Sequence, residues 1–357
     1  MSARPAAVGL CWRVFLFALL FSVDTARADE APTLNLLCWT EYVPASVIES
    51  FTRATGAKVT VASYHSNEQM LALLQARPGF YDLVQPSQAY VAALIGAQGL
   101  EPLDRAKLPN WRNLDPRFLG LPHDPENRFS VPWLAGTVGI VFDAAHVSDS
   151  IQNYADVFSG KYRGRIVAVD DGREMVAWAL ASLARPITDV SDDALAKAEP
   201  VLRQWLPQVG VFDSDSPHTA LQRGAAVIGI VWSGEAALLW QQDHRYQYVL
   251  PKEGAHMFLD SLAIPARAPH RALAEAFINH CLDPEISVLI SNEYPYTNPN
   301  LAARARLTAE QRANPASYPP GDPILAPLHN EGNDTPAVEA FVQRLRTSLP
   351  KAAPVVR

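Results

Sequence analysis

The feature that most constrains the fold is an alternation of short apolar runs and amphipathic segments that begins at residue 34. The first set consists, in chain order, of LNLLC (34–38), PASVIESFTRATG (44–56), KVTVAS (58–63), NEQMLALLQAR (67–77) and YDLVQPS (81–87). Strand, helix, strand, helix and strand in succession predict a parallel α/β sheet. Pro44 suits the first turn of the first helix, and Gly56 suits its C-terminal cap.

A second set of strands and helices follows the first. Its segments are GTVGIVF (136–142), GRIVAVDDGREMVAWALASL (164–183), VGVFDSDSPHTALQRG (209–224), AAVIGIVWSGEAALLWQQ (225–242) and YQYVLPKEG (246–254). FLDSLAIP (258–265) then predicts a strand that crosses back between the two sets, and a helix is expected at 270–282. The tail from about 305 is Pro-rich and irregular until a short amphipathic helix near 336–348. Two α/β lobes that face each other across a cleft are the simplest interpretation.

The N-terminus has the pattern of an export signal. Arg4 and Arg13 come before the apolar run VFLFALLFSV at 14–23, and Ala-Arg-Ala at 26–28 offers small residues for cleavage. The run is too short to span a bilayer as a helix. We therefore expect residues 1–28 to be removed and the mature protein to be soluble. Its formal net charge of −7 with the signal included is the opposite of what nucleic-acid binding requires, and it suits cationic or neutral partners.

Motifs for metal binding and catalysis are absent from the sequence. It holds no C-x-x-C, no H-E-x-x-H, no Gly-rich phosphate loop and no G-x-S-x-G. Two acids could still form a glycosidase pair, although nothing in the sequence fixes their separation. We expect no metal, no cofactor and no enzymatic activity. Cys38 and Cys281, which follow the predicted signal, could form one disulfide or remain two buried thiols.

Acids and aromatic residues gather where predicted strands end, which is the edge at which open α/β sheets bind ligands. These residues are Trp39, Glu41, Tyr42, Asp171, Glu174, Trp232, Phe258, Asp260 and Tyr296. Taken singly, Asp171 could cap a helix, with Glu174 completing a capping-box-like pattern, and Phe258 could be a core residue. Asp260 interrupts an apolar strand, where a carboxylate needs a partner. Together they predict an aromatic box with negative ends, which suits the ammonium groups and methylene chains of a linear polyamine.

Several short segments carry a resemblance to a known family. They are WTEYVP (39–44), SNE (66–68), YDLVQPS (81–87), LPNWRNLDP (108–116), DDGRE (170–174), FDSDSP (212–217), KEG (252–254), DSLAIP (260–265) and NPNLAAR (298–304). In these segments and their order, from about 33 to 349, the chain resembles the periplasmic spermidine/putrescine-binding proteins that deliver polyamines to ABC transporters.

The resemblance implies a two-lobed, type II periplasmic-binding-protein fold of the Venus-flytrap kind, with hinge crossings and closure around the ligand. One lobe would hold 33–135 and 260–304, and the other 136–259 and 305–357. The expected partners are a polyamine and the membrane permease subunits of an ABC transporter. A monomer in the periplasm is expected.

The resemblance also implies a set of ligand-binding residues. The family's pocket pattern is matched by Trp39, Thr40, Glu41, Tyr42, Ser87, Asp171, Glu174, Ser214, Trp232, Asp260 and Tyr296. Asp260 would clamp an internal amine, Glu41 one terminal amine, and Asp171 with Glu174 the other.

Three positions depart from the family's pattern. Ala89 stands where the family has Tyr, although Tyr90 is adjacent. Phe258 replaces a Trp, and His329 stands where a Gln would align. The first two changes should loosen the slot.

The ligand and the physiological role remain open at this stage. Because Asp260 would have no internal amine to bind in a diamine, spermidine is favoured over putrescine. A binder of another organic cation or of an amino-acid-like solute would have the same fold. A protein that presents polyamines to a membrane sensor would use the same pocket as a transport component.

Overall fold

The structure is a computed structural model that describes residues 31–40, 42–320 and 336–349, so the predicted signal at 1–28 lies outside the described residues. From Pro32 onward the chain forms one compact unit. None of the helices in the described ranges has the length and apolar character needed to cross a membrane.

The first half of the fold confirms the predicted alternation. Its elements are β1 (Thr33–Trp39), α1 (Ala45–Thr55), β2 (Lys58–Tyr64), α2 (Asn67–Ala76), β3 (Leu83–Val84) and α3 (Gln88–Gly96). β1 pairs in parallel with both β2 and β3. Gly56 caps α1 in the left-handed conformation, as predicted, and Pro44 is the N-cap residue. β3 is shorter than the predicted strand at 81–87, since Pro86 has no N–H for a ladder hydrogen bond.

The second half repeats the arrangement. Its elements are α4 (Tyr154–Val157), β5 (Ile166–Ala168), α5 (Gly172–Ser182), α6 (Asp192–Trp205), β6 (Val209–Phe212), α7 (His218–Gln222), β7 (Ile228–Trp232), α8 (Ser233–Gln242) and β8 (Tyr246–Val249). β5 is parallel to β6 and β7. Thus each half contains three parallel strands. The sequence predicts the parallel arrangement for the first set and the alternation of strands and helices for the second.

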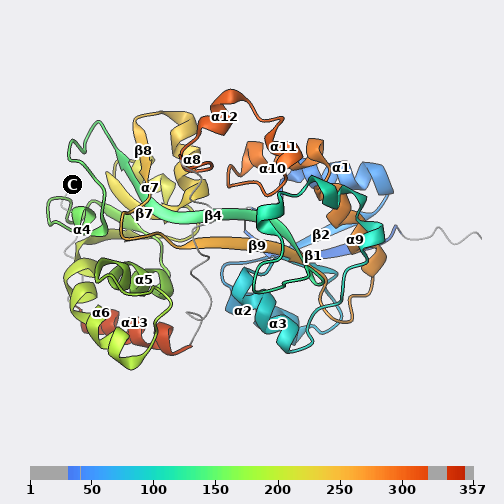
Figure 1. Ribbon diagram of the computed structural model, residues 1–357, viewed down its shortest axis with the longest axis horizontal. Coiled ribbons are helices and arrows are strands. Elements are labelled where there is room, and N and C mark those ends of the chain that lie inside the picture. The colour runs from blue at the N-terminus through green and yellow to red at the C-terminus, as the bar shows by residue number, and fades with distance from the viewer. Residues whose placement is uncertain (1–30, 41, 321–335, 350–357) are drawn as a thin grey trace, which may run out of the picture. The chain divides into compact units, whose positions relative to one another are not determined.

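Two long neighbouring strands join the halves. β4 (Ser130–Asp143) runs from the first half into the second, and β9 (Met257–Ala263) runs back beside it (Figure 1). They are antiparallel because the chain crosses in opposite directions along them. The described strands form one sheet in the order β2-β1-β3-β9-β4-β7-β5-β6, with β8 paired to β4. The predicted crossing at 258–265 is confirmed, whereas the segment at 136–142 is only the second part of the longer strand β4.

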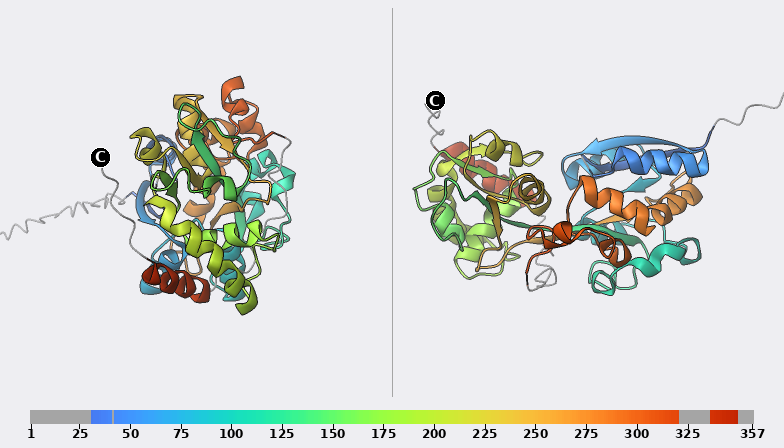
Figure 2. Two further views of the ribbon diagram at one scale, coloured as in Figure 1. Left: turned by 90° about the vertical axis from the view of Figure 1, so that its left-hand side faces the viewer. Right: turned by 90° about the horizontal axis from the view of Figure 1, so that it is seen from above.

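The remaining described elements are mostly helical. They are four 3₁₀ segments, η1 (Arg105–Lys107), η2 (Pro109–Asn113), η3 (Pro116–Phe118) and η4 (Leu206–Gln208), and the helices α9 (Arg271–Cys281), α10 (Pro284–Glu293), α11 (Leu301–Arg304), α12 (Ala309–Ala313) and α13 (Pro336–Ser348). Figure 2 shows helices gathered around each half of the sheet. The predicted helix at 336–348 is confirmed as α13.

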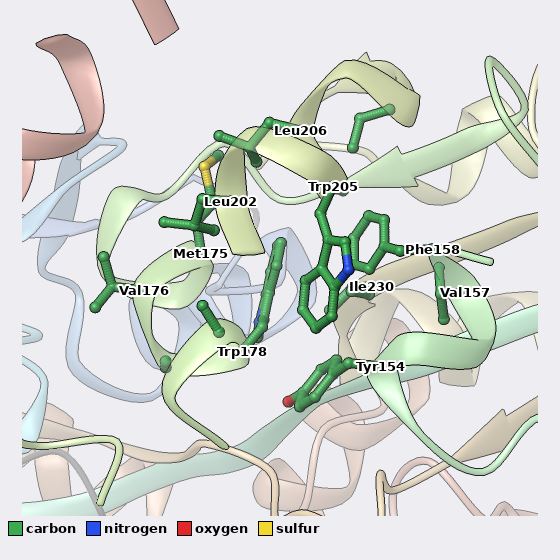
Figure 3. Close-up of a cluster of buried hydrophobic side chains, with 14 of the residues drawn as sticks. Tyr154, Val157, Phe158, Met175, Val176, Trp178, Leu202, Trp205, Leu206 and Ile230 are labelled. Atoms are coloured by element: carbon green, nitrogen blue, oxygen red, sulfur yellow. The ribbon is translucent and has the colours of Figure 1, made fainter. Parts of the chain in front are cut away.

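Each half has its own hydrophobic core. In the second half, Phe158 stacks on Trp205 with ring centroids 4.5 Å apart, and Trp178 lies in the same cluster (Figure 3). α13 adds Val338 and Phe341 to this cluster, so the C-terminal helix is anchored against α5 and α6.

Both cysteines in the described residues lie in the core of the first half as free, buried thiols. Burial raises the pKa of Cys38 to about 12, so the thiol stays protonated at neutral pH.

Candidate functional site

A cavity of about 690 Å³ brings the predicted site residues together. It is lined from both halves of the fold and from the crossing strand β9. The predicted residues that line it are Trp39, Thr40, Tyr42, Ser87, Asp171, Glu174, Ser214, Trp232, Phe258, Asp260 and Tyr296. The two other predicted positions, Glu41 and His329, lie outside the described residues.

Asp260 lies on the crossing strand β9, opposite Leu134 of β4, and is only 3% exposed. A buried carboxylate needs hydrogen-bond donors, and Asp260 has two. The Ser87 hydroxyl donates to Oδ1 at 2.6 Å, and the Tyr42 hydroxyl donates to Oδ2 at 2.9 Å. Burial raises the pKa of Asp260 to about 6, although both hydrogen bonds oppose the shift. The carboxylate is therefore fixed in place but is costly to charge without a cation.

Ser87 is itself held in position. The Asn67 side-chain amide donates to the Ser87 hydroxyl at 3.1 Å, and its oxygen accepts from the Ser87 backbone N–H at 3.2 Å. Asn67 is the first residue of α2, so the start of that helix orients the hydroxyl that binds Asp260.

Aromatic rings form a continuous wall along the cavity. The ring-centroid distances are 4.7 Å for Tyr64–Trp39, 6.3 Å for Trp39–Tyr42, 5.5 Å for Tyr42–Tyr296, 5.8 Å for Tyr296–Phe258 and 5.7 Å for Phe258–Trp232. The Trp232 indole N–H donates to the Ser214 carbonyl at 3.1 Å, which fixes the last ring of the wall. Faces of this kind pack against methylene groups and attract cations.

Two glycines make room for this wall. A Cβ on Gly136 would meet the Phe258 ring, and one on Gly234 would meet the Tyr296 ring. Both positions therefore require the absence of a side chain.

The Asp171 carboxylate already has hydrogen-bond and ion-pair partners within the protein. It caps α5 by accepting from the backbone N–H groups of Arg173 and Glu174, and it pairs with the Arg173 guanidinium at 2.9 Å. Burial works against its charge, but the Arg173 guanidinium and the two backbone N–H groups together outweigh burial and lower the pKa of Asp171. The predicted capping role is confirmed for Asp171. The Glu174 carboxylate instead turns to the imidazole of His256.

The pair of Glu174 and His256 is buried, with side-chain exposures of 5% and 8%. Burial disfavours the charged imidazole, but the Glu174 carboxylate outweighs it and raises the pKa of His256. Sequence reasoning missed His256. Because residues two apart on a strand share a face, its spacing before Phe258 and Asp260 would have placed it beside them.

Four buried polar atoms of the cavity residues have no hydrogen-bond partner among the residues that the structure describes. They are Nε1 of Trp39, Oε2 of Glu174, Oγ of Ser214 and Nε2 of His256. Buried polar atoms are usually paired, so each of these groups lacks the hydrogen-bond partner that such an atom normally has. Within the described ranges, no cluster of three or more His, Cys, Asp or Glu side chains suits a metal ion.

Known proteins share both the sequence and the fold. Residues 46–319 match the family model described as bacterial extracellular solute-binding protein. The chain is 35% identical over 334 residues to the spermidine/putrescine-binding periplasmic protein of Salmonella typhimurium, covering 92% of this chain and 96% of the relative. This chain belongs to the bacterial extracellular solute-binding protein family.

Two further comparisons place this solute-binding protein among its relatives. It is 32% identical over 351 residues to the putrescine-binding periplasmic protein of Escherichia coli strain K12, covering 92% of this chain and 94% of the relative. The crystal structure of the substrate-binding protein of a spermidine/putrescine ABC transporter from Streptococcus pneumoniae superposes with a TM-score of 0.76 at 26% identity, covering 89% of this chain and 99% of the other. The two-lobed α/β fold with crossing strands is that of periplasmic binding proteins.

At one departure from the family pattern, Ala89 and Tyr90 are both absent from the described lining of the cavity. Tyr90 is 7% exposed, and its hydroxyl donates to the Glu68 carboxylate, which does line the cavity. The neighbouring tyrosine therefore does not replace the missing ring in the wall. It positions an additional acid.

An ion pair and a histidine–aspartate contact of this solute-binding protein link the first half to the second across the cavity. Arg173 lies 3.7 Å from Glu68, and His65 lies 3.0 Å from Asp215. The second pair is exposed, with both side chains more than half accessible. Sequence reasoning singled out the strand ends that carry these residues but assigned none of the four.

Proposed function

We propose that this solute-binding protein binds a linear polyamine, with spermidine preferred over putrescine, and delivers it in the periplasm to the membrane permease subunits of an ABC transporter. The observation that carries the proposal is Asp260, a buried carboxylate that is held by two hydroxyl donors and lines an aromatic-walled cavity. A buried carboxylate of this kind favours a cation as its partner.

The relatives support the choice of ligand and of compartment. Their names assign spermidine, putrescine or both as ligands and the periplasm as their location. The export-signal pattern at 1–28 agrees with that location. We propose that the protein acts as a monomer and releases its ligand chemically unchanged.

In the proposed complex, Asp260 binds an internal amine and the rings of Trp39, Tyr42 and Trp232 pack on the methylene chain. One terminal amine occupies the end of the cavity near Asp171, and the resemblance assigns the other terminal amine to Glu41. A diamine would leave Asp260 without an internal amine, which is why spermidine is preferred.

We also propose that the lobes are 33–135 with 260–304 and 136–259 with 305–357, and that they close on the ligand by a hinge at β4 and β9. The separate hydrophobic cores of the two halves support this division. The Glu68–Arg173 pair would stabilise the closed form, since it joins the two halves.

The test is isothermal titration of the mature protein after unfolding, dialysis and refolding, which removes any co-purified polyamine. Spermidine, putrescine, spermine and cadaverine are titrated separately at low salt. We expect one-to-one binding with spermidine tightest. No heat from any of the four amines, in a protein shown to be folded by circular dichroism, would contradict the proposal.

One observation favours a second candidate, an amino-acid-like solute. The Arg173 guanidinium lines the cavity, and guanidinium groups bind carboxylates well. Its pairing with Asp171 and Glu68 weighs against this role. Titration with ornithine and 4-aminobutyrate separates the candidates: tighter binding of either than of spermidine would favour the second one.

A further inference from the structure

Glu174, which the resemblance assigns to a terminal amine, is already paired in this protein. Its carboxylate contacts the His256 imidazole, and the pair is buried. A ligand ammonium there would have to share the carboxylate with a ring that its surroundings favour in the charged form. The second end of the cavity therefore needs another source of negative charge if it is to bind a terminal amine.

Glu339 supplies a carboxylate at that end. It lies on α13, lines the same cavity as Asp260, and is half-buried. A Cβ on Gly172 would lie 2.9 Å from both of its carboxylate oxygens, so the carboxylate rests directly over the start of α5. α13 is anchored in the core of the second half, which fixes the backbone position from which the Glu339 side chain extends.

The electrostatics around Glu339 are those of a site that lacks a cation. Burial raises the pKa of Glu339, and the nearby acids Asp171 and Glu68 raise it further, against the opposing effects of Arg173 and of a hydrogen bond from the Gly172 backbone N–H. Arg173 is itself shared between Asp171 and Glu68. An added ammonium group would relieve the repulsion among the three carboxylates.

A second, independent observation points to a ligand at this end. Oε2 of Glu174 and Nε2 of His256 are buried cavity atoms without a partner among the described residues, and both residues are more than nine-tenths buried. Glu174, His256 and Glu339 all line the same cavity. A ligand N–H group at this end would give the Glu174 oxygen a partner, whereas Nε2 of a charged imidazole is itself a donor and needs an acceptor.

We propose that Glu339 of the C-terminal helix binds the terminal ammonium group of the polyamine, in the place that Glu174 cannot fill while it is paired with His256. This inference rests on the proposed function and names a specificity-determining residue for it. The second end then selects for a charged terminus, and a ligand with a neutral group there loses the contact.

The test compares Glu339→Gln with the wild-type protein by titration of spermidine and its two mono-N-acetylated isomers, in each of which one terminal amine has become a neutral amide. Because a hydrogen bond between charged groups is lost, we expect Glu339→Gln to weaken spermidine binding roughly tenfold to a hundredfold. For the isomer acetylated at the end that faces Glu339, both proteins should bind within about twofold of each other. The other isomer keeps the amine that faces Glu339, so Glu339→Gln should weaken its binding as much as that of spermidine.

Glu126→Gln is the matched control, because Glu126 is an exposed glutamate away from the cavity and the substitution removes the same charge. It should bind all three ligands as the wild type does. Thermal unfolding of both variants checks that they are folded.

Gly172→Ala tests the same contact without removing the carboxylate. Alanine is a better helix former than glycine, so α5 should be retained. Its Cβ would displace the Glu339 side chain, and spermidine affinity should fall in the same direction as in Glu339→Gln.

The outcomes separate this inference from the proposed function. If wild-type protein binds spermidine and Glu339→Gln binds it equally well, the role of Glu339 is refuted and the polyamine function stands. Equal losses for all three ligands would show a merely structural effect and would also refute it. If the wild-type protein binds none of the polyamines, the proposed function itself fails.

Discussion

The Tyr42 hydroxyl donates a hydrogen bond of 2.9 Å to Oδ2 of Asp260, across a separation of 218 residues in the sequence. Tyr42 belongs to the segment after β1, whereas Asp260 lies on the strand that joins the two halves of the sheet. The contact therefore ties the first half of the fold to the crossing strand at the point where we place the internal amine of the ligand.

Tyr42→Phe tests this contact, because it keeps the ring and removes only the donor. Loss of a hydrogen bond to a charged carboxylate should weaken spermidine binding by about 1.5–3 kcal/mol. It should also raise the pKa of Asp260 above its present value of about 6, since this bond favours the charged form. Titration calorimetry at several pH values measures both effects. Unchanged affinity and an unchanged pH profile would contradict the role given to Tyr42.

Polyamine affinity should fall as the pH drops through about 6, because an amine requires the charged carboxylate of Asp260. Well below that pH the dissociation constant should rise about tenfold per pH unit. Asp260→Asn should bind weakly and should lack this dependence between pH 5 and pH 7. A wild-type affinity that is flat over this range would show that the charge of Asp260 does not hold the ligand.

The ligand-free protein should show the opposite trend in stability. Asp260 has a folded-state pKa of about 6, above its usual 3.8, so its contribution is fully present below pH 3.8 and is lost as the pH rises through about 6. The free energy of unfolding should therefore be roughly 3 kcal/mol lower well above pH 6 than below pH 3.8, as far as Asp260 is concerned. Denaturant titrations of wild type and Asp260→Asn at pH 5 and pH 7 sample the upper part of this range, where the wild type should lose about 1.4 kcal/mol that the asparagine variant does not lose.

Gly234→Ala should damage the aromatic wall, because its Cβ would meet the Tyr296 ring. Overpacking of this kind costs about 1–3 kcal/mol, and displacement of the ring should also weaken spermidine binding. Gly96→Ala in α3 is the matched control, since a Cβ there meets nothing within 4 Å. Urea unfolding and titration calorimetry read out both effects. Equal stability and affinity of the two variants would refute the packing argument.

Asp215→Asn should have only a small effect on ligand affinity, although the His65–Asp215 pair crosses the cavity. Both side chains are more than half exposed, so the contact should contribute no more than an exposed ion pair does, which is about 0–1 kcal/mol. The effect should shrink further at 0.5 M salt, because salt screens exposed charges. A tenfold or larger loss of affinity that persists at high salt would show that this pair is a principal closure contact.

Local sequence patterns predicted the strand ends well, for physical reasons that the structure makes clear. Asp260 had to have a partner because it interrupts an apolar strand, and Tyr42 and Ser87 provide it. The alternation of strands and helices placed Trp39 and Trp232 at the carboxyl ends of their strands, which face the cavity from the two halves. These inferences depend on the spacing of apolar residues and on a charged residue that interrupts an apolar run, and both can be read from a sequence.

The contacts at the second end of the cavity could not be predicted in the same way. The Glu174–His256 pair joins residues 82 positions apart, and sequence alone showed only a capping-like spacing for Glu174. Glu339 reaches the cavity because α13 docks on α5 and α6. A periodic apolar face predicts that such a helix packs, but it does not say against which elements.

The most direct test of the central claim is titration of spermidine into refolded, ligand-free Asp260→Asn beside the wild type at pH 7. Removal of one partner from a buried charge pair should cost about 2–5 kcal/mol, which is a loss of affinity of at least roughly thirtyfold in a variant that remains folded. Spermidine binding by Asp260→Asn as tight as that of the wild type would contradict the account, because the ligand would then be held without the buried carboxylate.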